Sequence, residues 1–151
     1  MIKTTVKNHE HYMQKCIDLA IIAKQQGESP VGSVIVKNGE IIAEGFEAAK
    51  AHNDITFHAE VVAIRKATSL LKSQDLSGCI LYTTHEPCIM CSYVIRHTKI
   101  SRVVVGIATG EIGGFSSAYP ILIDSQVKRW KEHPVILVGI LEAECRKLHS
   151  E

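Results

Sequence analysis

Two long segments of the chain carry apolar residues at helical spacing. In residues 10–26 the apolar positions fall on one side of a helix, and Gly27 supplies a stop. Residues 58–72 repeat this spacing, with polar residues between the apolar ones. The pattern predicts two amphipathic helices, each with one buried face.

Short β-branched runs alternate with these helices. Residues 31–46 contain two such runs around Asn38-Gly39, a dipeptide that strongly indicates a tight β-hairpin. We therefore expect the first two strands to be antiparallel neighbours. Further apolar runs predict strands at residues 79–84, 102–107 and 134–140.

The remaining segments complete an alternation of helices and strands. Residues 87–97 open with proline, which is favoured at the start of a helix, and residues 141–150 predict a last helix. The glycine-rich segment 108–134 predicts a loop with a short helix over residues 119–130. The alternation predicts a three-layer α/β domain with a mostly parallel sheet, formed by residues 1–151 as one domain.

Composition and charge exclude several classes of protein. With 46% hydrophobic and 22% charged residues, the chain has the composition of a globular domain. A net charge of +1 gives no whole-chain sign of a polyanionic partner. The apolar runs are too short to cross a membrane and no secretion signal is evident, so we expect a cytoplasmic protein. Five cysteines, an odd number, argue for reduced thiols.

Two short motifs are candidates for a metal site: "HAE" at residues 58–60 and "PCIMC" at residues 87–91. Cys88 and Cys91 share one helix face and can occupy two corners of a tetrahedron. His58 supplies a third corner if the two helix starts face each other. The fourth corner would stay open for water, as in catalytic zinc sites. Glu60, at the same helix start as His58, could take a proton from that water.

Other interpretations of the cysteines are possible. A thiol oxidoreductase also places C-x-x-C at a helix start after a strand, although this leaves His58 and Glu60 unexplained. A zinc ribbon needs a second ligand pair, which the other cysteines do not form. We therefore expect these three to be core residues: Cys16, Cys79 and Cys145.

The order of the two motifs, H-x-E and then P-C-x-x-C, is the signature of zinc-dependent nucleobase deaminases. The chain resembles the cytidine and deoxycytidylate deaminase superfamily over nearly its whole length. Within it, "SPVGSVIVKNGEIIAEG", "LYTTHEPCIMC" and "GILEAEC" are similar to the branch of tRNA adenosine deaminases, guanine deaminases and fungal-type cytosine deaminases. The resemblance implies a three-layer α/β/α cytidine-deaminase-like fold with a central five-stranded mixed sheet.

The resemblance also implies a mechanism. His58, Cys88 and Cys91 would bind one Zn²⁺ per chain, and Glu60 would move protons. A zinc-bound hydroxide would attack a ring carbon that bears an amino group, and ammonia would leave. The backbone around Ala59 and the start of the Cys88 helix would hold the base.

One departure from the family concerns the substrate. Where this branch has an asparagine that bonds the base, this chain has Glu47. A carboxylate there would favour a ring edge rich in N–H donors. Alternatively, Glu47 faces solvent and Asn53 takes the role.

Four further residues are candidates around the pocket. Phe57 replaces a small residue before the zinc histidine, and we expect it to pack rather than narrow the pocket. His85 either bonds the substrate or caps a turn. Phe115 and Tyr119 could stack on a flat ring as a lid, or simply anchor their loop.

These observations lead to a ranked prediction of function. The near-neutral charge and the ending "RKLHSE", without a basic tail, favour a small-molecule substrate: a free nucleobase, nucleoside or related aminoheterocycle, purine-like or guanine-like first. A tRNA wobble-adenosine deaminase is the alternative, and a thiol oxidoreductase is an alternative of another class. The resemblance further implies a homodimer.

Overall fold

One five-stranded sheet, in the order β2-β1-β3-β4-β5, organises the computed structural model, which describes residues 6–150. Its strands are β1 (Gly32–Lys37), β2 (Glu40–Phe46), β3 (Ile80–His85), β4 (Arg102–Ile107) and β5 (Val135–Val138). Strand β1 pairs antiparallel with β2 and β3, whereas β3, β4 and β5 run parallel. The sheet is thus mixed, as the resemblance implies, and less parallel than the alternation of elements alone predicts.

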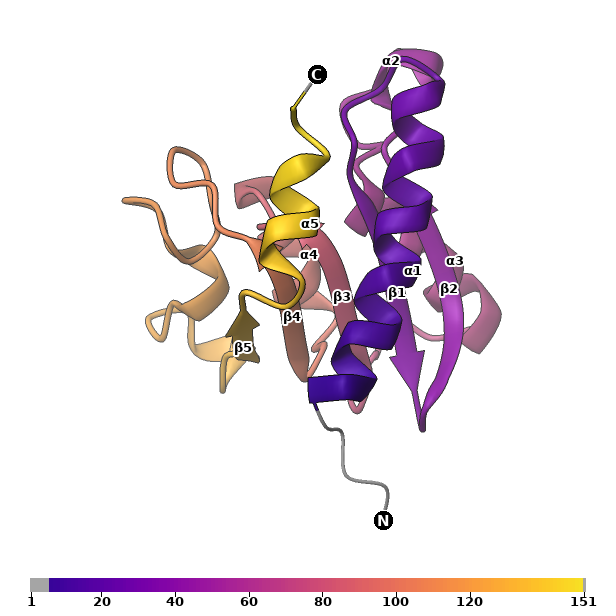
Figure 1. Cartoon of the computed structure of the whole chain (residues 1–151). Helices are drawn as coiled ribbons and strands as arrows, with labels where there is room; N and C mark the ends of the chain where they lie inside the picture. The colour runs from indigo at the N-terminus through magenta and orange to yellow at the C-terminus, as the bar shows by residue number, and fades with distance from the viewer. Residues whose placement is uncertain (1–5, 151) are drawn as a thin grey trace.

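Helices cover both faces of the sheet (Figure 1). Helices α1 (Val6–Gln25) and α5 (Glu142–Lys147) pack on one face, in a core that includes Val34 and Val36. Helices α3 (Ala59–Leu71) and α4 (Ile89–His97) pack on the other, in a core that includes Ile35. Because side chains of a strand alternate between faces, β1 contributes to both cores. The expected three-layer architecture is confirmed.

The β1–β2 hairpin turns where the sequence predicts it. Asn38 and Gly39 both have positive φ angles, 52° and 79°. That conformation suits asparagine and glycine, and it matches the twist of the flanking strands. The hairpin ends β2 close to the start of α3, where one of the metal motifs begins.

A short helix, α2 (Ala49–His52), lies between β2 and α3. The carboxylate of Glu28 accepts hydrogen bonds from the backbone N–H groups of Lys50 (3.0 Å) and Ala51 (2.8 Å). These bonds satisfy donors that a helix start leaves unpaired. The carboxylate comes from more than twenty residues away, so local patterns do not reveal it.

The predicted helix over residues 119–130 is wrong. Two 3-10 turns stand there instead, η1 (Ile121–Ile123) and η2 (Lys128–Trp130). The buried Arg96 donates from Nη1 to the carbonyl oxygens of Ile121 (2.9 Å) and Asp124 (2.8 Å). In a continuous helix these carbonyl oxygens would accept hydrogen bonds from backbone N–H groups one turn later. Because they accept from Arg96 instead, the segment stays irregular.

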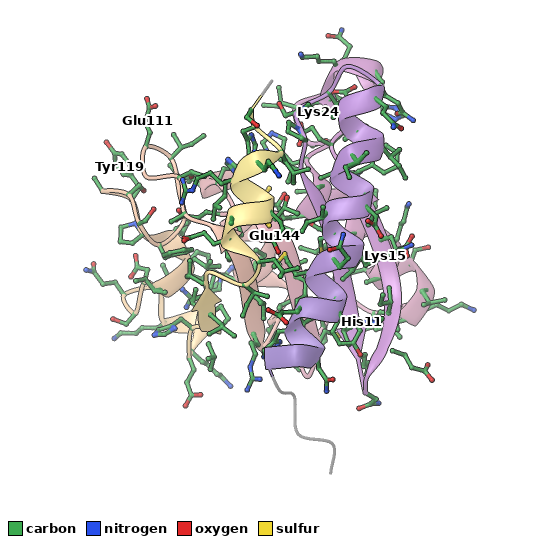
Figure 2. All side chains as sticks on the ribbon, in the orientation of Figure 1. His11, Lys15, Lys24, Glu111, Tyr119 and Glu144 are labelled. Carbon is green, nitrogen blue, oxygen red and sulfur yellow. The ribbon has the colours of Figure 1, made fainter. Side chains whose placement is uncertain are left out.

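The surface and the core contain the expected kinds of residue. Charged side chains such as Lys15 and Glu144 project outward from their helices (Figure 2). Cys16, Cys79 and Cys145 are fully buried. In the part of the chain from 6 to 150, every helix is too short or too polar to cross a bilayer.

Candidate metal centre and active site

Both metal motifs lie at the start of a helix. His58 is the N-cap residue of α3 and Cys88 is the N-cap residue of α4, and each has an extended backbone. Strand β2 approaches α3 very closely, because a Cβ atom on Gly45 would lie 2.5 Å from the carbonyl oxygen of Ala59. Helix starts carry partial positive charge, which favours thiolates and carboxylates in the space between them.

The three proposed ligands converge on one point. Nδ1 of His58 lies 3.5 Å from Sγ of Cys88 and 3.5 Å from Sγ of Cys91. Zinc binds sulfur at about 2.3 Å and nitrogen at about 2.0–2.1 Å, so tetrahedral angles separate the two ligand atoms by about 3.5 Å. Among the residues described, this is the one group of histidine, cysteine and acidic side chains close enough to hold an ion. His58, Cys88 and Cys91 are positioned to bind one metal ion.

The three side chains His58, Cys88 and Cys91 shift one another's pKa values even without a metal ion. Hydrogen bonds from Cys91 and His58 lower the pKa of Cys88 to about 4. The bond with Cys88 raises the pKa of His58 to about 9, against the opposing effect of burial. The bond to Cys88 and burial raise the pKa of Cys91. A metal ion must displace the protons on His58 and Cys91, so metal affinity should rise with pH.

Glu60 lies beside the ligands in the first turn of α3. Glu60 is only 3% exposed, and its Oε1 lies 3.8 Å from Sγ of Cys91. Burial raises the pKa of Glu60 to about 7, and the neighbouring Cys88 adds to the shift. A carboxyl group with this pKa can both accept and release a proton near neutral pH.

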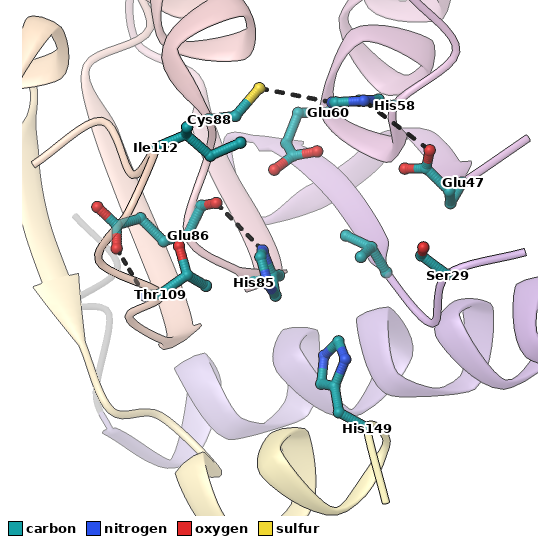
Figure 3. A pocket seen from close by; sticks show the side chains of 11 residues that line it. Ser29, Glu47, His58, Glu60, His85, Glu86, Cys88, Thr109, Ile112 and His149 are labelled. Atoms are coloured by element: carbon teal, nitrogen blue, oxygen red, sulfur yellow. Dashed lines mark hydrogen bonds and ion pairs between the residues drawn. The ribbon is translucent and has the colours of Figure 1, made fainter. Parts of the chain in front are cut away.

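A cavity of about 280 Å³ opens in front of these side chains (Figure 3). The sulfur of Cys88 and the carboxylate of Glu60 lie on one side of the cavity, and His149 lies on the opposite side (Figure 3). The cavity is lined by Ser29, Val31, Glu47, His58, Glu60, His85, Glu86, Cys88, Thr109, Ile112 and His149.

Two of the predicted substrate residues line this cavity. Glu47 is 9% exposed and faces His58, so it does not point to solvent. His85 donates from Nδ1 to the carbonyl oxygen of Glu86 (3.3 Å), which leaves Nε2 as an acceptor. Ala59 is fully buried, and its backbone N–H faces the carboxylate of Glu47.

The other predicted substrate residues lie outside the lining. Asn53 is an exposed residue that ends α2. Phe115 packs against the core between the sheet and α3. Tyr119 is 66% exposed and extends away from the body of the molecule (Figure 2). Phe57 stacks on the ring of His52 at 3.9 Å, so it packs as expected and does not narrow the cavity.

Sequence reasoning missed the residues on the far side of the cavity. His149 reaches it because Nζ of Lys24 donates to the carbonyl oxygens of Leu148 (2.8 Å) and Ser150 (2.8 Å). This fixes the segment after α5 against α1, and the His149 ring lies 5.3 Å from that of His85. No local signal links His149 to residues so far away in the sequence.

Glu86 anchors the loop that forms another wall. Its carboxylate accepts N–H bonds from Thr109 (2.8 Å), Phe115 (2.9 Å) and Ser116 (2.8 Å). Glu86 is 1% exposed, and a Cβ atom on Gly113 would lie 2.2 Å from the carboxylate. The residue directly before the zinc motif therefore holds the 109–116 loop against the pocket.

Comparisons with known proteins agree with this geometry. The family model for the cytidine and deoxycytidylate deaminase zinc-binding region matches residues 6–107. The tRNA-specific adenosine deaminase of Aquifex aeolicus is 36% identical over 129 residues, which are 83% of this chain and 85% of the relative. A solved structure from studies of A-to-I editing by tRNA:A34 deaminases has a TM-score of 0.85 at 30% identity, covering 91% of this chain and 98% of the other. Guanine deaminase from Bacillus subtilis has a TM-score of 0.64 at 42% identity, covering 66% and 64%.

These comparisons correct the predicted substrate class. The prediction of a free nucleobase or nucleoside as the main substrate is wrong, because the tRNA-specific adenosine deaminase of Aquifex aeolicus and the tRNA:A34 deaminase structure match 83% and 91% of this chain. Net charge misled the prediction, since it averages over the whole surface and does not describe the surface around one pocket. The alternative prediction of a thiol oxidoreductase is also wrong, because the sulfurs of Cys88 and Cys91 share a metal site with His58. The chain belongs to the zinc-binding family of cytidine and deoxycytidylate deaminases and is a zinc-dependent hydrolase of that class.

Proposed function

We propose that this chain deaminates adenosine in tRNA to inosine. The observation that carries the proposal is the likeness to a tRNA:A34 deaminase structure over 91% of this chain and 98% of the other, at a TM-score of 0.85. The match extends well beyond the metal motifs, which deaminases of different substrates share.

The reaction adds water to the ring carbon that bears the amino group and then breaks the carbon–nitrogen bond. His58, Cys88 and Cys91 would hold a zinc ion, whose Lewis acidity lowers the pKa of a water molecule toward neutrality. Glu60 takes a proton from the attacking water and delivers it to the ring nitrogen. It then takes the proton of the newly added hydroxyl group and delivers it to the departing amine, which leaves as ammonia. Its pKa of about 7 and its position 3.8 Å from Cys91 support both steps.

The cavity has room for the base, and the base would sit between the metal site and the His85–His149 wall. The backbone N–H of Ala59 and the side chains of Glu47 and His85 are the groups we assign to the base and its sugar. Asn53 and Tyr119 are exposed and outside the cavity lining, so we assign them to the flanking nucleotides and not to the base.

A homodimer is the second part of the proposal. Helices α3 and α4 frame a mainly apolar groove of about 280 Å³, lined by Val61, Ile64, Arg65, Thr68, Gln74, Tyr93, Val94, His97 and Thr98. Tyr93 is 48% exposed there, which suits a protein interface better than solvent. Sedimentation should give twice the chain mass for the wild type and the single-chain mass for Tyr93→Glu. A wild-type monomer at micromolar concentration would contradict this part.

The function is tested by incubating the zinc-loaded protein with an unmodified tRNA transcript and digesting the product to nucleosides. Mass spectrometry should detect inosine with the wild type and none with Glu60→Gln. Binding of the transcript should weaken steeply with salt, because phosphate contacts release counterions. Ammonia release from free guanine or adenine, without inosine in any tRNA, would overturn the proposal.

A further inference from the structure

The imidazole of His58 lies between the sulfur of Cys88 and the carboxylate of Glu47 (Figure 3), and Cys91 brings a second sulfur to the same ring nitrogen as Cys88. Nδ1 is the atom 3.5 Å from each sulfur, and Nε2, on the opposite side of the ring, lies 4.0 Å from Oε2 of Glu47. When Nδ1 binds a metal, the ring hydrogen must be on Nε2. That hydrogen then points toward Glu47.

The fold places the Glu47 carboxylate with little freedom. The backbone N–H of Glu47 donates to the carbonyl oxygen of Val31 (3.1 Å), and the next residue, Ala48, donates to Phe57 (3.0 Å). These bonds join the end of β2 to the segment that leads into α3. The Ala59 N–H also faces the carboxylate, and the residue is 9% exposed.

Glu47 has few other partners. Among the side chains that the structure describes, those of residues 8–150, His58 is the basic one that comes within ion-pair distance of Glu47. The acidic neighbours Glu28 and Glu60 repel it. A buried carboxylate in such surroundings is costly unless it is bonded to a donor.

We propose that Glu47 is a positioning residue for the metal centre. Its carboxylate accepts a hydrogen bond from Nε2–H of His58 and so holds the ring with Nδ1 toward the metal. Metal-bound histidines usually donate their second N–H to such a group, and its loss costs about 10- to 100-fold in metal affinity or activity. A shift of about 1 Å in the carboxylate would bring Oε2 from 4.0 Å to hydrogen-bond distance of Nε2. The inference concerns metal retention, so it goes beyond the proposed function.

Zinc affinity separates this role from contact with the base. Apoprotein is titrated with zinc in competition with a chromophoric chelator, for the wild type, Glu47→Ala and Glu47→Gln. The alanine variant should bind zinc about 10- to 100-fold more weakly. The glutamine variant keeps an acceptor oxygen and should lose less.

Glu44→Gln is the matched control. It removes a carboxylate from β2, three residues before Glu47; the Glu44 side chain is 41% exposed and pairs with Lys15 at 3.4 Å. Its zinc affinity should equal that of the wild type, and circular dichroism should confirm that all variants are folded. Wild-type zinc affinity in Glu47→Ala, with a raised KM for substrate, would overturn the inference. The titration uses no nucleic acid, so failure of the proposed tRNA activity leaves its result unaffected.

Discussion

Replacing Glu86 by glutamine should destabilise the protein and open the pocket. The two carboxylate oxygens accept four hydrogen bonds from the 109–116 loop: Oε1 accepts from Thr109 N–H and the Ser116 hydroxyl, and Oε2 from Phe115 N–H and Ser116 N–H. Glutamine has one acceptor oxygen. If the NH₂ group of the glutamine takes the place of Oε2, the N–H groups of Phe115 and Ser116 both lose their acceptor. If it takes the place of Oε1, only the N–H of Thr109 loses its acceptor, because the Ser116 hydroxyl can rotate and accept a hydrogen bond from the NH₂ group.

The magnitude follows from the second, less costly orientation. Leaving one donor without a partner costs about 1–3 kcal/mol, and bonds to a neutral acceptor are about 1 kcal/mol weaker than those to a charged one. Because the loop is partly exposed, we expect a total loss of about 2–4 kcal/mol from an unfolding free energy of about 5–15 kcal/mol. Thr109 and Ile112 line the cavity, so KM should rise as the loop loosens.

Urea unfolding at neutral pH with saturating zinc measures the change. Glu111→Gln is the control, because it removes an exposed carboxylate of the same loop and should change stability by less than about 0.5 kcal/mol. If Glu86→Gln were as stable as this control and kept the wild-type KM, the loop anchor would be refuted.

Three further predictions concern the site and the pH dependence of folding. Glu60→Gln should lower kcat by at least about 100-fold while the zinc content stays at one per chain, since Glu60 moves protons and does not bind the metal; normal turnover would exclude that role. Cys91→Ser should lose most of its zinc by elemental analysis, and full retention would exclude Cys91 as a ligand. Burial and Arg102 lower the pKa of His9, whose Nδ1 lies 2.8 Å from the hydroxyl of Tyr82. The unfolded chain therefore binds more protons below the ordinary value of 6.5, so stability is highest above that pH and falls as the pH drops through it. Urea unfolding between pH 7.5 and 5.5 should show a smaller loss for His9→Gln than for the wild type; equal losses would contradict the prediction.

Much of the fold could be predicted because its signals are local. Asn38-Gly39 specifies the hairpin through two positive φ angles, and the spacing of apolar residues identifies the long helices. The metal ligands could be predicted for a similar reason. Cys88 and Cys91 are separated by one helical turn, and the H-x-E motif has a fixed place at a helix start.

The remaining features depend on contacts between distant segments. Helix α2 needs the Glu28 carboxylate, and the irregular segment after Pro120 depends on Arg96. His149 lines the pocket only because Lys24 anchors the segment after α5. The substrate class was predicted wrongly because deaminases of bases and of tRNA share the residues that bind the metal and move the proton.

Zinc K-edge X-ray absorption on the purified, zinc-loaded protein tests the metal centre most directly. We predict one zinc per chain with two sulfur neighbours at about 2.3 Å and two nitrogen or oxygen neighbours at about 2.0–2.1 Å, one of them not from the protein. A third sulfur neighbour, or fewer than two, would contradict the assignment of His58, Cys88 and Cys91 as the complete set of protein ligands.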